Sequence, residues 1–347
     1  MNALITGGCG FVGSNLAAYL LDKGEKVTVF DNLSRHGASA NLTWLRTLST
    51  AEHNPVTFIH GDVRNAFDVE SVVKEIRPDV IFHLAGQVAM TTSMQSPRRD
   101  FEINVLGSIN VLEAVRQYLP KTAIIYASSN KVYGNLDHLD LVEVETRYQP
   151  RTLTQGVDES VAIEFHTPYG CSKGAADQYM LDYARGFGLN TVVFRHSTIY
   201  GGRQFATFDQ GWVGWFCRQA LEAQQDPARE PFTVSGDGKQ VRDLLHVSDA
   251  VRCYVAAYEH IDAARGQAFN IGGGIENSMS LLELLNFLED RLSLKLNYKH
   301  LPWRQSDQKF FVADNSKAAR LINWIPRTTR EQGLETVIDW ENQAPKS

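Results

Sequence analysis

The chain has few cysteines, no long apolar run and no excess of basic residues. Its four cysteines, Cys9, Cys171, Cys217 and Cys253, lie far apart and form no Cys-x-x-Cys or histidine pairing. This spacing argues against a disulfide framework and a zinc site, so no metal is expected. No apolar run approaches the roughly 20 residues that span a bilayer, and the first expected strand leaves no room for a signal peptide. We therefore expect a cytoplasmic protein without a membrane partner.

Charge and composition exclude further classes. The 347 residues carry a formal net charge of −6, and lysine and arginine are scattered along the chain, which argues against a nucleic-acid partner. A hydrophobic content of 43% and a charged content of 21% are typical of a globular protein. The sequence contains no internal repeat and no low-complexity tract. This length allows one large domain or two modest ones.

The first 32 residues contain the pattern of a dinucleotide-binding site. An apolar run leads into three glycines spaced Gly7-x-x-Gly10-x-x-Gly13, and the next apolar run ends on Asp31. We interpret this order as strand, glycine turn, helix, strand and acid. The glycines permit a tight turn and let backbone amides approach a pyrophosphate at the helix N-terminus. An ordinary turn is the alternative, but the position between a strand and a helix favours dinucleotide binding.

Asp31 also bears on which dinucleotide binds. A carboxylate at the end of the second strand accepts hydrogen bonds from the ribose hydroxyls of NAD and repels the additional phosphate of NADP. Arg35 follows four residues later, and an arginine there could accommodate that phosphate. Its alternative role is a solvated loop charge. With Asp31 in place, the sequence favours NAD.

Apolar segments alternate with segments of helical periodicity through the first two thirds of the chain. The expected strands cover residues 56–60, 80–84, 123–127 and 191–195, and the expected helices cover residues 69–76, 104–118 and 174–187. This alternation predicts an α/β fold, a doubly wound Rossmann parallel sheet with a smaller C-terminal substrate-binding α/β domain. We expect residues 1–199 to form the NAD-binding domain, residues 239–260 to return to it, and residues 200–347 to form the smaller domain.

Tyr169 and Lys173 are candidates for acid–base chemistry. They are four residues apart in a helical segment, so they share one face. An ammonium beside a phenol lowers the tyrosine pKa from about 10, as a general base near neutrality requires. A surface pair is the alternative, but the upstream dinucleotide motif favours the catalytic interpretation.

Ser129 follows the expected strand at residues 123–127. Its hydroxyl should therefore lie at the carboxyl edge of the sheet, where it could bind the reacting sugar oxygen together with Tyr169. The alternative is a hydrogen-bonded loop serine. The next residues are Asn130 and Lys131. They do not supply the general acid and base that would eliminate water from an oxidised sugar, so a dehydratase is disfavoured.

Together these motifs resemble the extended short-chain dehydrogenase/reductases of the nucleotide-sugar epimerase/dehydratase group. The resemblance covers nearly the whole chain and includes the glycine motif, residues 83–86, residues 104–107, Ser128-Ser129, Tyr169 with Lys173, and residues 242–247. Residues 31–35, 87–93, 129–134 and 201–206 are similar to members that epimerise a CDP-linked hexose at C2. Two departures from the familiar 4-epimerases, which carry lysine where Val88 falls and Asn-Pro where Ser197-Thr198 falls, disfavour a simple 4-epimerase.

The resemblance implies which residues bind the cofactor NAD and the nucleotide-sugar substrate. The implied catalytic residues are Tyr169, Lys173 and Ser129. The implied cofactor-binding residues are Gly7, Gly10, Phe11, Val12, Gly13, Asp31, Asn32, Ser34, Arg35, Asp62, Val63, Leu84, Ala85, Gly86, Ser128, Tyr169 and Lys173. The implied substrate-binding residues are Gln87, Thr92, Ser129, Asn130, Gln204, Arg242 and Arg304. The two arginines would grip the diphosphate bidentately, with surface ion pairs as the alternative.

The activity implied is epimerisation at C2 by transient oxidation to a 2-keto sugar. Three alternatives stay open: a UDP-hexose 4-epimerase, a nucleotide-sugar reductase or dehydrogenase with net redox, and a non-catalytic NAD-binding regulator. A regulator would be expected to lose Tyr169, Lys173 or Ser129, and the chain retains all three. A homo-oligomer, either a dimer or a tetramer, is also expected, because relatives pair through helices of the first domain.

Overall fold

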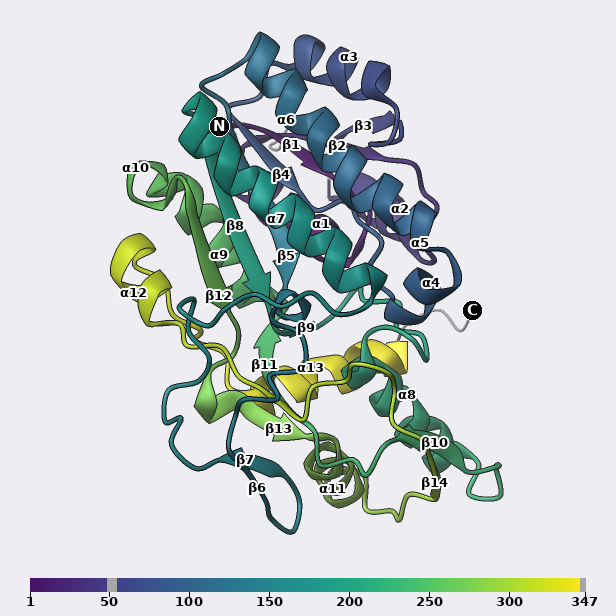
Figure 1. Cartoon of the computed structure of the whole chain (residues 1–347). Coiled ribbons are helices and arrows are strands. Elements are labelled where there is room, and N and C mark those ends of the chain that lie inside the picture. The colour runs from purple at the N-terminus through teal and green to yellow at the C-terminus, as the bar shows by residue number, and fades with distance from the viewer. Residues whose placement is uncertain (49–54, 344–347) are drawn as a thin grey trace.

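The computed structural model describes residues 1–48 and 55–343, and a seven-stranded parallel sheet lies at the centre of its upper half (Figure 1). Its strands are β1 (Asn2–Thr6), β2 (Lys26–Asp31), β3 (Thr57–His60), β4 (Val80–His83), β5 (Ala123–Ser129), β8 (Asn190–His196) and β12 (Gln267–Ile271). The strand order is β12-β8-β5-β4-β1-β2-β3, and each neighbouring pair runs parallel. Because the chain reverses direction across the sheet between β1 and β4, a ligand crevice is expected at their carboxyl ends.

Helices cover both faces of this sheet, which confirms the predicted Rossmann class (Figure 1). One face carries α1 (Phe11–Asp22), α2 (Ala38–Thr47) and α9 (Val247–Glu259), and the other carries α3 (Ala66–Ile76), α6 (Gly107–Tyr118) and α7 (Thr167–Phe187). Side chains alternate between the faces along each strand. In β1, Ala3 and Ile5 pack into the α1 side, whereas Leu4 packs into the α7 side. Strands buried on both faces therefore read as continuous apolar runs.

Three features differ from the sequence prediction. The helix expected at residues 104–118 begins with a π-helical turn, η1 (Glu102–Leu106), before α6. Helix α7 begins at Thr167 and runs without a break through Tyr169 and Lys173 into the helix expected at residues 174–187, so the two expected helical segments are one helix. β12 was not expected as a strand of the large sheet, yet it pairs with β8 along its whole length.

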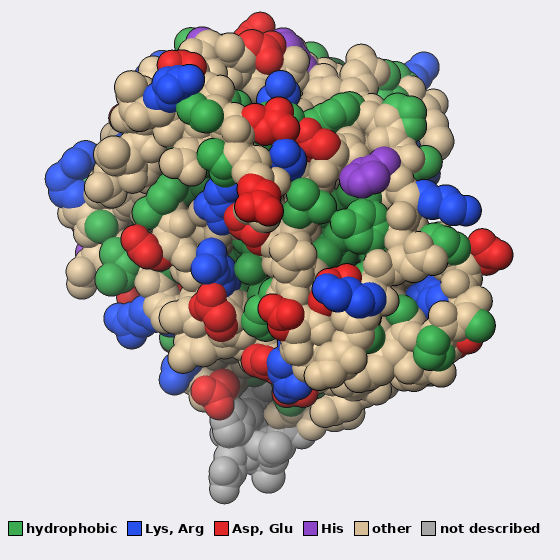
Figure 2. Space-filling model, turned by 90° about the horizontal axis from the view of Figure 1, so that it is seen from below, with side chains coloured by type: hydrophobic (Ala, Val, Ile, Leu, Met, Phe, Trp, Pro, Cys, Tyr) green, Lys and Arg blue, Asp and Glu red, His purple; other side chains and the backbone are tan. Residues whose placement is uncertain are grey.

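A smaller region lies below the carboxyl ends of the large sheet (Figure 1). Its strands are β6 (Leu141–Glu143), β7 (Tyr148–Pro150), β9 (Thr198–Tyr200), β10 (Phe232–Ser235), β11 (Val241–His246), β13 (Ser278–Ser280), β14 (Tyr298–Leu301) and β15 (Phe310–Phe311). Its main helices are α8 (Trp212–Gln225), α11 (Leu281–Leu292) and α13 (Arg330–Gln343), which share a core with Tyr200 and Leu244. Figure 2 views this end, where basic and acidic side chains are interspersed.

The chain crosses between the two regions several times. β11 pairs with β9, β13 and β15 in the smaller region, whereas α9, which follows it directly, packs in the core beside α1. The segment at residues 239–260 thus belongs to both regions. β12 lies in the large sheet although residues 267–271 fall within the expected second domain. The short remaining elements are α4 (Met90–Gln95), α5 (Pro97–Phe101), η2 (Asn130–Tyr133), α10 (Ile261–Ala264), η3 (Ile275–Asn277) and α12 (Ser316–Ile322).

A buried ion pair joins the sheet to α7. Arg195 on β8 contacts Asp177 through two hydrogen bonds of 2.8 and 2.9 Å, and the Asp177 side chain is 1% exposed. Arg195 also donates to the Tyr133 hydroxyl at 2.9 Å, and the Ser128 hydroxyl donates to Asp177 at 2.9 Å. Since Ser128 neighbours Ser129, this network fixes the end of β5 that carries the candidate catalytic serine.

Replacing Arg195 by Met should destabilise the fold strongly. The substitution leaves the buried Asp177 carboxylate without its guanidinium, which costs about 3–5 kcal/mol, and the thermal midpoint should fall by on the order of 10 °C. Thermal unfolding followed by circular dichroism measures this. The control is Arg98→Met, because the Arg98 side chain is 92% exposed and pairs with Glu102 on the surface. Equal midpoints for the two variants would contradict the prediction.

Candidate active site

The glycine turn forms a backbone cradle at the start of α1. Gly7 has a φ of +69°, and a Cβ there would lie 2.7 Å from the Ala85 amide nitrogen. A Cβ on Gly13 would lie 2.3 Å from the Gly7 carbonyl oxygen. Gly10 is the N-cap of α1 and supplies no side chain. Free backbone N–H groups therefore face outward at the positive end of the helix, an arrangement that suits a pyrophosphate.

A cavity of about 470 Å³ opens beside this turn, along the carboxyl ends of β1, β2, β4 and β5. All residues predicted to bind the cofactor line it: Gly7, Gly10, Phe11, Val12, Gly13, Asp31, Asn32, Ser34, Arg35, Asp62, Val63, Leu84, Ala85, Gly86, Ser128, Tyr169 and Lys173. These residues come from separate segments of the first half of the fold. The glycine cradle and the acid at the end of β2 therefore lie in one site, and this site fits NAD.

Asp31 is held in place by backbone amides. Its Oδ2 accepts from the Cys9 N–H at 3.0 Å, and its Oδ1 accepts from the Leu33 N–H at 2.8 Å. Burial raises the pKa of Asp31, and these two hydrogen bonds partly offset the rise. Arg35 is exposed at the same cavity, and burial lowers its pKa while the nearby Asp209 carboxylate raises it. An acidic neighbour makes Arg35 a weaker attractor of a 2′-phosphate.

Changing Asp31 to Ser should shift cofactor preference. The change removes the ribose hydrogen bonds and the repulsion of a 2′-phosphate, so NAD affinity should fall roughly tenfold or more. NADP should improve relative to NAD. Fluorescence titration of cofactor-free protein measures both dissociation constants, with Asp22→Ser as the matched control, because Asp22 is an exposed carboxylate at the far end of α1 and should leave NAD affinity near wild type. Wild-type protein that already prefers NADP would overturn the assignment of Asp31.

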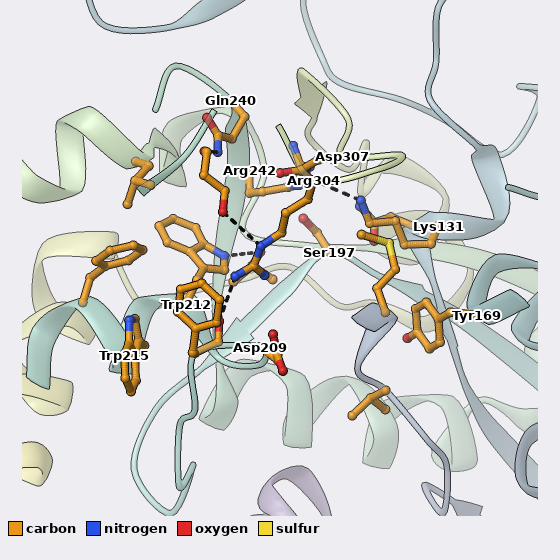
Figure 3. A pocket seen from close by; sticks show the side chains of 18 of the residues that line it. Lys131, Tyr169, Ser197, Asp209, Trp212, Trp215, Gln240, Arg242, Arg304 and Asp307 are labelled. Carbon is orange, nitrogen blue, oxygen red and sulfur yellow. Dashed lines mark hydrogen bonds and ion pairs between the residues drawn. The ribbon is translucent and has the colours of Figure 1, made fainter. Parts of the chain in front are cut away.

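A second cavity, of about 240 Å³, lies between the two regions of the fold (Figure 3). It is lined by Val88, Met90, Asn130, Lys131, Tyr169, Ser197, Thr198, Phe208, Asp209, Trp212, Trp215, Phe216, Thr233, Ser235, Gln240, Arg242, Leu281, Arg304 and Asp307. Asn130, Lys131 and Tyr169 line both cavities, and Ser129 lines the first. The phenol therefore lies where a ligand in one cavity would meet a ligand in the other.

The titration of Tyr169 and Lys173 differs from the sequence prediction. Burial raises the pKa of Tyr169 to about 12, and a hydrogen bond with the Ser129 hydroxyl partly offsets this rise. Burial lowers the pKa of Lys173 to about 8, while Asp100 opposes that shift. The Lys173 Nζ donates to the Ala127 carbonyl at 2.9 Å. The expected lowering of the Tyr169 pKa by Lys173 is therefore wrong for this structure, because desolvation dominates.

Polar groups of α5, η1 and the loop after β4 support the N-terminal part of α7. Asn104, in the π-helical turn, donates to the Ser172 hydroxyl at 2.9 Å, and that hydroxyl donates to Asp100. Gln87 donates to Asp100 at 2.7 Å and accepts from the Ala89 N–H at 2.5 Å. Gln87 is thus occupied in this network and lines neither cavity. A π-turn at a functional site re-aims side chains, here Asn104.

The predicted substrate residues separate into three groups. Asn130, Arg242 and Arg304 line the second cavity, whereas Ser129 and Gln204 line only the cofactor cavity. Thr92, like Gln87, lines neither cavity, so its contact with substrate stays a prediction. Arg242 forms a 2.7 Å ion pair with Asp307. Arg304 donates to the Phe208 carbonyl at 3.0 Å, and its guanidinium lies 4.8 Å from the Phe208 ring centroid.

The sequence interpretation missed several residues of the second cavity. Among them are Lys131, Trp212 and Asp307, which come from three distant segments. The run rich in Gly, Trp and Phe after Tyr200 was the available signal for Trp212. Within the described ranges, no group of three or more histidine, cysteine or acidic residues is arranged to hold a metal ion. None of the described helices combines the length and hydropathy that a bilayer span requires.

The chain is similar to known proteins both in sequence and in architecture. The chain is 56% identical over 340 residues to the CDP-paratose 2-epimerase of Salmonella typhi, covering 98% of this chain and 99% of that protein. The UDP-glucose 4-epimerase of Thermotoga maritima, solved with UDP-glucose, superimposes with a TM-score of 0.81 at 27% identity over 99% of both chains. The UDP-glucuronic acid 4-epimerase of Bacillus cereus, solved with UDP-glucuronic acid and NAD, superimposes with a TM-score of 0.82 at 26% identity over 99% of both chains. Residues 3–272 match the family described as NAD dependent epimerase/dehydratase, and the chain belongs to that family.

Proposed function

We propose that the protein is an NAD-dependent epimerase that inverts C2 of a CDP-linked hexose. The proposed reaction is of the type that converts CDP-paratose to CDP-tyvelose. The observation that carries the reaction type is the position of Tyr169 where the cofactor cavity meets the second cavity. The choice of C2 and of CDP follows the relative that is 56% identical over nearly both full lengths.

The proposed mechanism assigns each step to a side chain. Tyr169 removes the proton of the C2 hydroxyl, and the Ser129 hydroxyl donates a hydrogen bond to the same oxygen. When bound, NAD supplies the oxidation and the later reduction of C2. Lys173 stabilises negative charge near this oxygen with its ammonium. After the 2-keto sugar turns its other face to the cofactor, Tyr169 returns the proton, and no net redox results.

The nucleotide diphosphate must stay fixed while the sugar turns. Arg242 and Arg304 enter the second cavity from β11 and from the loop after β14, and a guanidinium fork matches phosphate oxygens. Their present partners are Asp307 and the Phe208 carbonyl, both at the cavity wall. Binding energy from the diphosphate then positions the sugar beside Tyr169, while the sugar itself stays free to turn.

A panel of nucleotide sugars tests this function. Purified protein incubated in deuterated water with CDP-paratose, CDP-glucose or UDP-glucose should convert CDP-paratose to its C2 epimer, as followed by NMR. Inversion of UDP-glucose at C4 instead would favour the 4-epimerase alternative, which the 27% identical Thermotoga enzyme represents. Stoichiometric consumption of added NADH or NAD would favour the reductase or dehydrogenase alternative.

The remaining assignments belong to the same proposal. The NAD-binding domain consists of residues 1–199 together with α9 and β12, and the remaining residues of 200–347, β11 included, form the nucleotide-sugar-binding domain. The chain forms a homo-oligomer through α6 and α7, whose exposed Tyr118, Tyr179 and Phe187 offer apolar surface for pairing. The location is the cytoplasm, and the interspersed charges seen in Figure 2 suit a small-molecule enzyme better than a nucleic-acid binder.

A further inference from the structure

Lys131 lies two residues after the candidate catalytic serine, in a tightly held segment. Its backbone N–H donates to the Ser129 hydroxyl at 3.2 Å. The preceding Asn130 donates to Gln308 at 2.9 Å, and Gln308 in turn donates to the Gly134 carbonyl at 2.7 Å. These side chains are buried. The base of the Lys131 side chain is therefore fixed relative to Ser129.

The ammonium of Lys131 points into the second cavity. Its Nζ donates to the Ser306 carbonyl at 3.2 Å and lies 3.6 Å from the Asp307 carboxylate, and the side chain is 17% exposed. A lysine ammonium has three N–H donors, so it can donate to a ligand oxygen as well as to these two partners. In Figure 3, Lys131 lies on the Tyr169 side of Arg304.

Positive charge exceeds negative charge around Asp307. Lys131, Arg242 and Arg304 all lower the pKa of this carboxylate, against the effect of burial. The pKa of Lys131 is lowered to about 8, mainly by burial and in smaller part by Arg242, while Asp307 opposes the shift. Asp209 also lines the cavity but is exposed, and Figure 3 draws it apart from the cluster. Asp243, next to Arg242 in the chain, is a second carboxylate that acts on that arginine, but it does not line the cavity. The three cations around Asp307 therefore give this part of the cavity wall an excess of positive charge, which suits the negative charge of a nucleotide-sugar diphosphate.

The position of the reacting carbon explains why a cation is needed here. C2 is bonded to C1, which carries the phosphate oxygen, whereas C4 lies across the sugar ring. An enzyme that oxidises C2 must therefore hold the sugar-side phosphate closer to its catalytic tyrosine than an enzyme that oxidises C4. We propose that Lys131 binds the sugar-side phosphate and so places C2 at Tyr169. This inference rests on the proposed function and names the residue that selects the carbon.

Binding of CDP and of CMP to the NAD-loaded protein tests the contact, because only CDP carries the outer phosphate that corresponds to the sugar side. In Lys131→Met, calorimetric titration should show CDP affinity reduced about tenfold to a hundredfold, with CMP affinity unchanged. Lys131→Arg should retain most of the CDP affinity. The matched control is Lys121→Met, which removes an exposed lysine just before the opposite end of β5.

Several outcomes would overturn the inference. Unchanged CDP affinity in Lys131→Met would do so, as would an equal loss for CDP and CMP, which would place the contact at the nucleoside-side phosphate. Should Lys131→Met lose bound NAD or fold poorly, Lys131→Gln replaces it in the same titration. Wild-type protein that binds UDP but not CDP would contradict the proposed substrate instead, and UDP with UMP would then test Lys131 separately.

Steady-state kinetics test the placement of C2. Lys131→Met should lower kcat for C2 inversion as well as raise KM, because a sugar that is no longer anchored beside Tyr169 reaches the reactive position less often. Lys131→Arg should restore kcat to within a fewfold of wild type. A change confined to KM would show that Lys131 adds affinity without selecting the carbon, and would overturn that part of the inference.

Discussion

Replacing Tyr169 by Phe should lower turnover by roughly 10² or more while NAD stays bound. The ring of Tyr169 is 8% exposed and packs at the junction of the two cavities, so phenylalanine keeps the packing and loses only the hydroxyl. That hydroxyl is the proposed carrier of the sugar proton. Turnover of the epimer by NMR and cofactor content by absorbance measure the two effects separately.

Tyr19→Phe is the matched control for this substitution. It removes a phenolic hydroxyl from α1 at a side chain that lines neither cavity, so turnover should be close to wild type. Near-normal turnover in Tyr169→Phe, or equal losses in the two variants, would overturn the assignment of the base.

The pH dependence of kcat should also show that Tyr169 acts as the base. A base acts when deprotonated, and burial places the pKa of Tyr169 at about 12 despite the opposing Ser129 hydrogen bond. The active form is then a minor fraction at neutral pH and grows as pH rises, so wild-type kcat should increase with pH through and above neutrality. The residual rate of Tyr169→Phe should lack this rise.

The cofactor half of the site could be predicted from the sequence because its residues follow strand ends in order. Gly7 and Leu84 stand directly after buried parallel strands and Asp31 is the last residue of one, and parallel strands bring their carboxyl ends to one edge. The local sequence pattern therefore already indicates that these residues meet at one edge of the folded sheet. The other cofactor residues were implied by the resemblance to the family, and they line the same cavity.

The substrate half was less predictable because its walls come from segments that no periodicity connects. Asp307 joins Arg242 and Lys131 across separations of 65 and 176 residues, and only the folded chain brings them together. The predicted direction of the Tyr169 pKa shift was wrong for a related reason. The helical spacing to Lys173 was read correctly, but the desolvation that outweighs a nearby cation depends on burial that a sequence does not display.

Substrate deuterated at C2 should keep its label in the epimer when the reaction runs in ordinary water, with retention close to complete. In the proposed reaction the C2 hydrogen leaves and returns to the same carbon inside a site where Tyr169 and Lys173 are buried, so it does not exchange with solvent. Mass spectrometry or NMR of the product measures the retained label. The control is C4-deuterated substrate, which should keep its label and turn over at the unlabelled rate.

The same experiment separates the chemistries that share these residues. Deprotonation next to a carbonyl would exchange the C2 hydrogen with water, and loss of label would therefore overturn transient oxidation. If hydride transfer limits the rate, the C2 label should also slow turnover, because the bond that breaks is at that carbon. An isotope effect confined to C4, with inversion there, would instead identify a 4-epimerase. In that case C4, across the ring from C1, would lie at Tyr169, and the sugar-side phosphate would lie farther from Tyr169 than the C2 reaction requires.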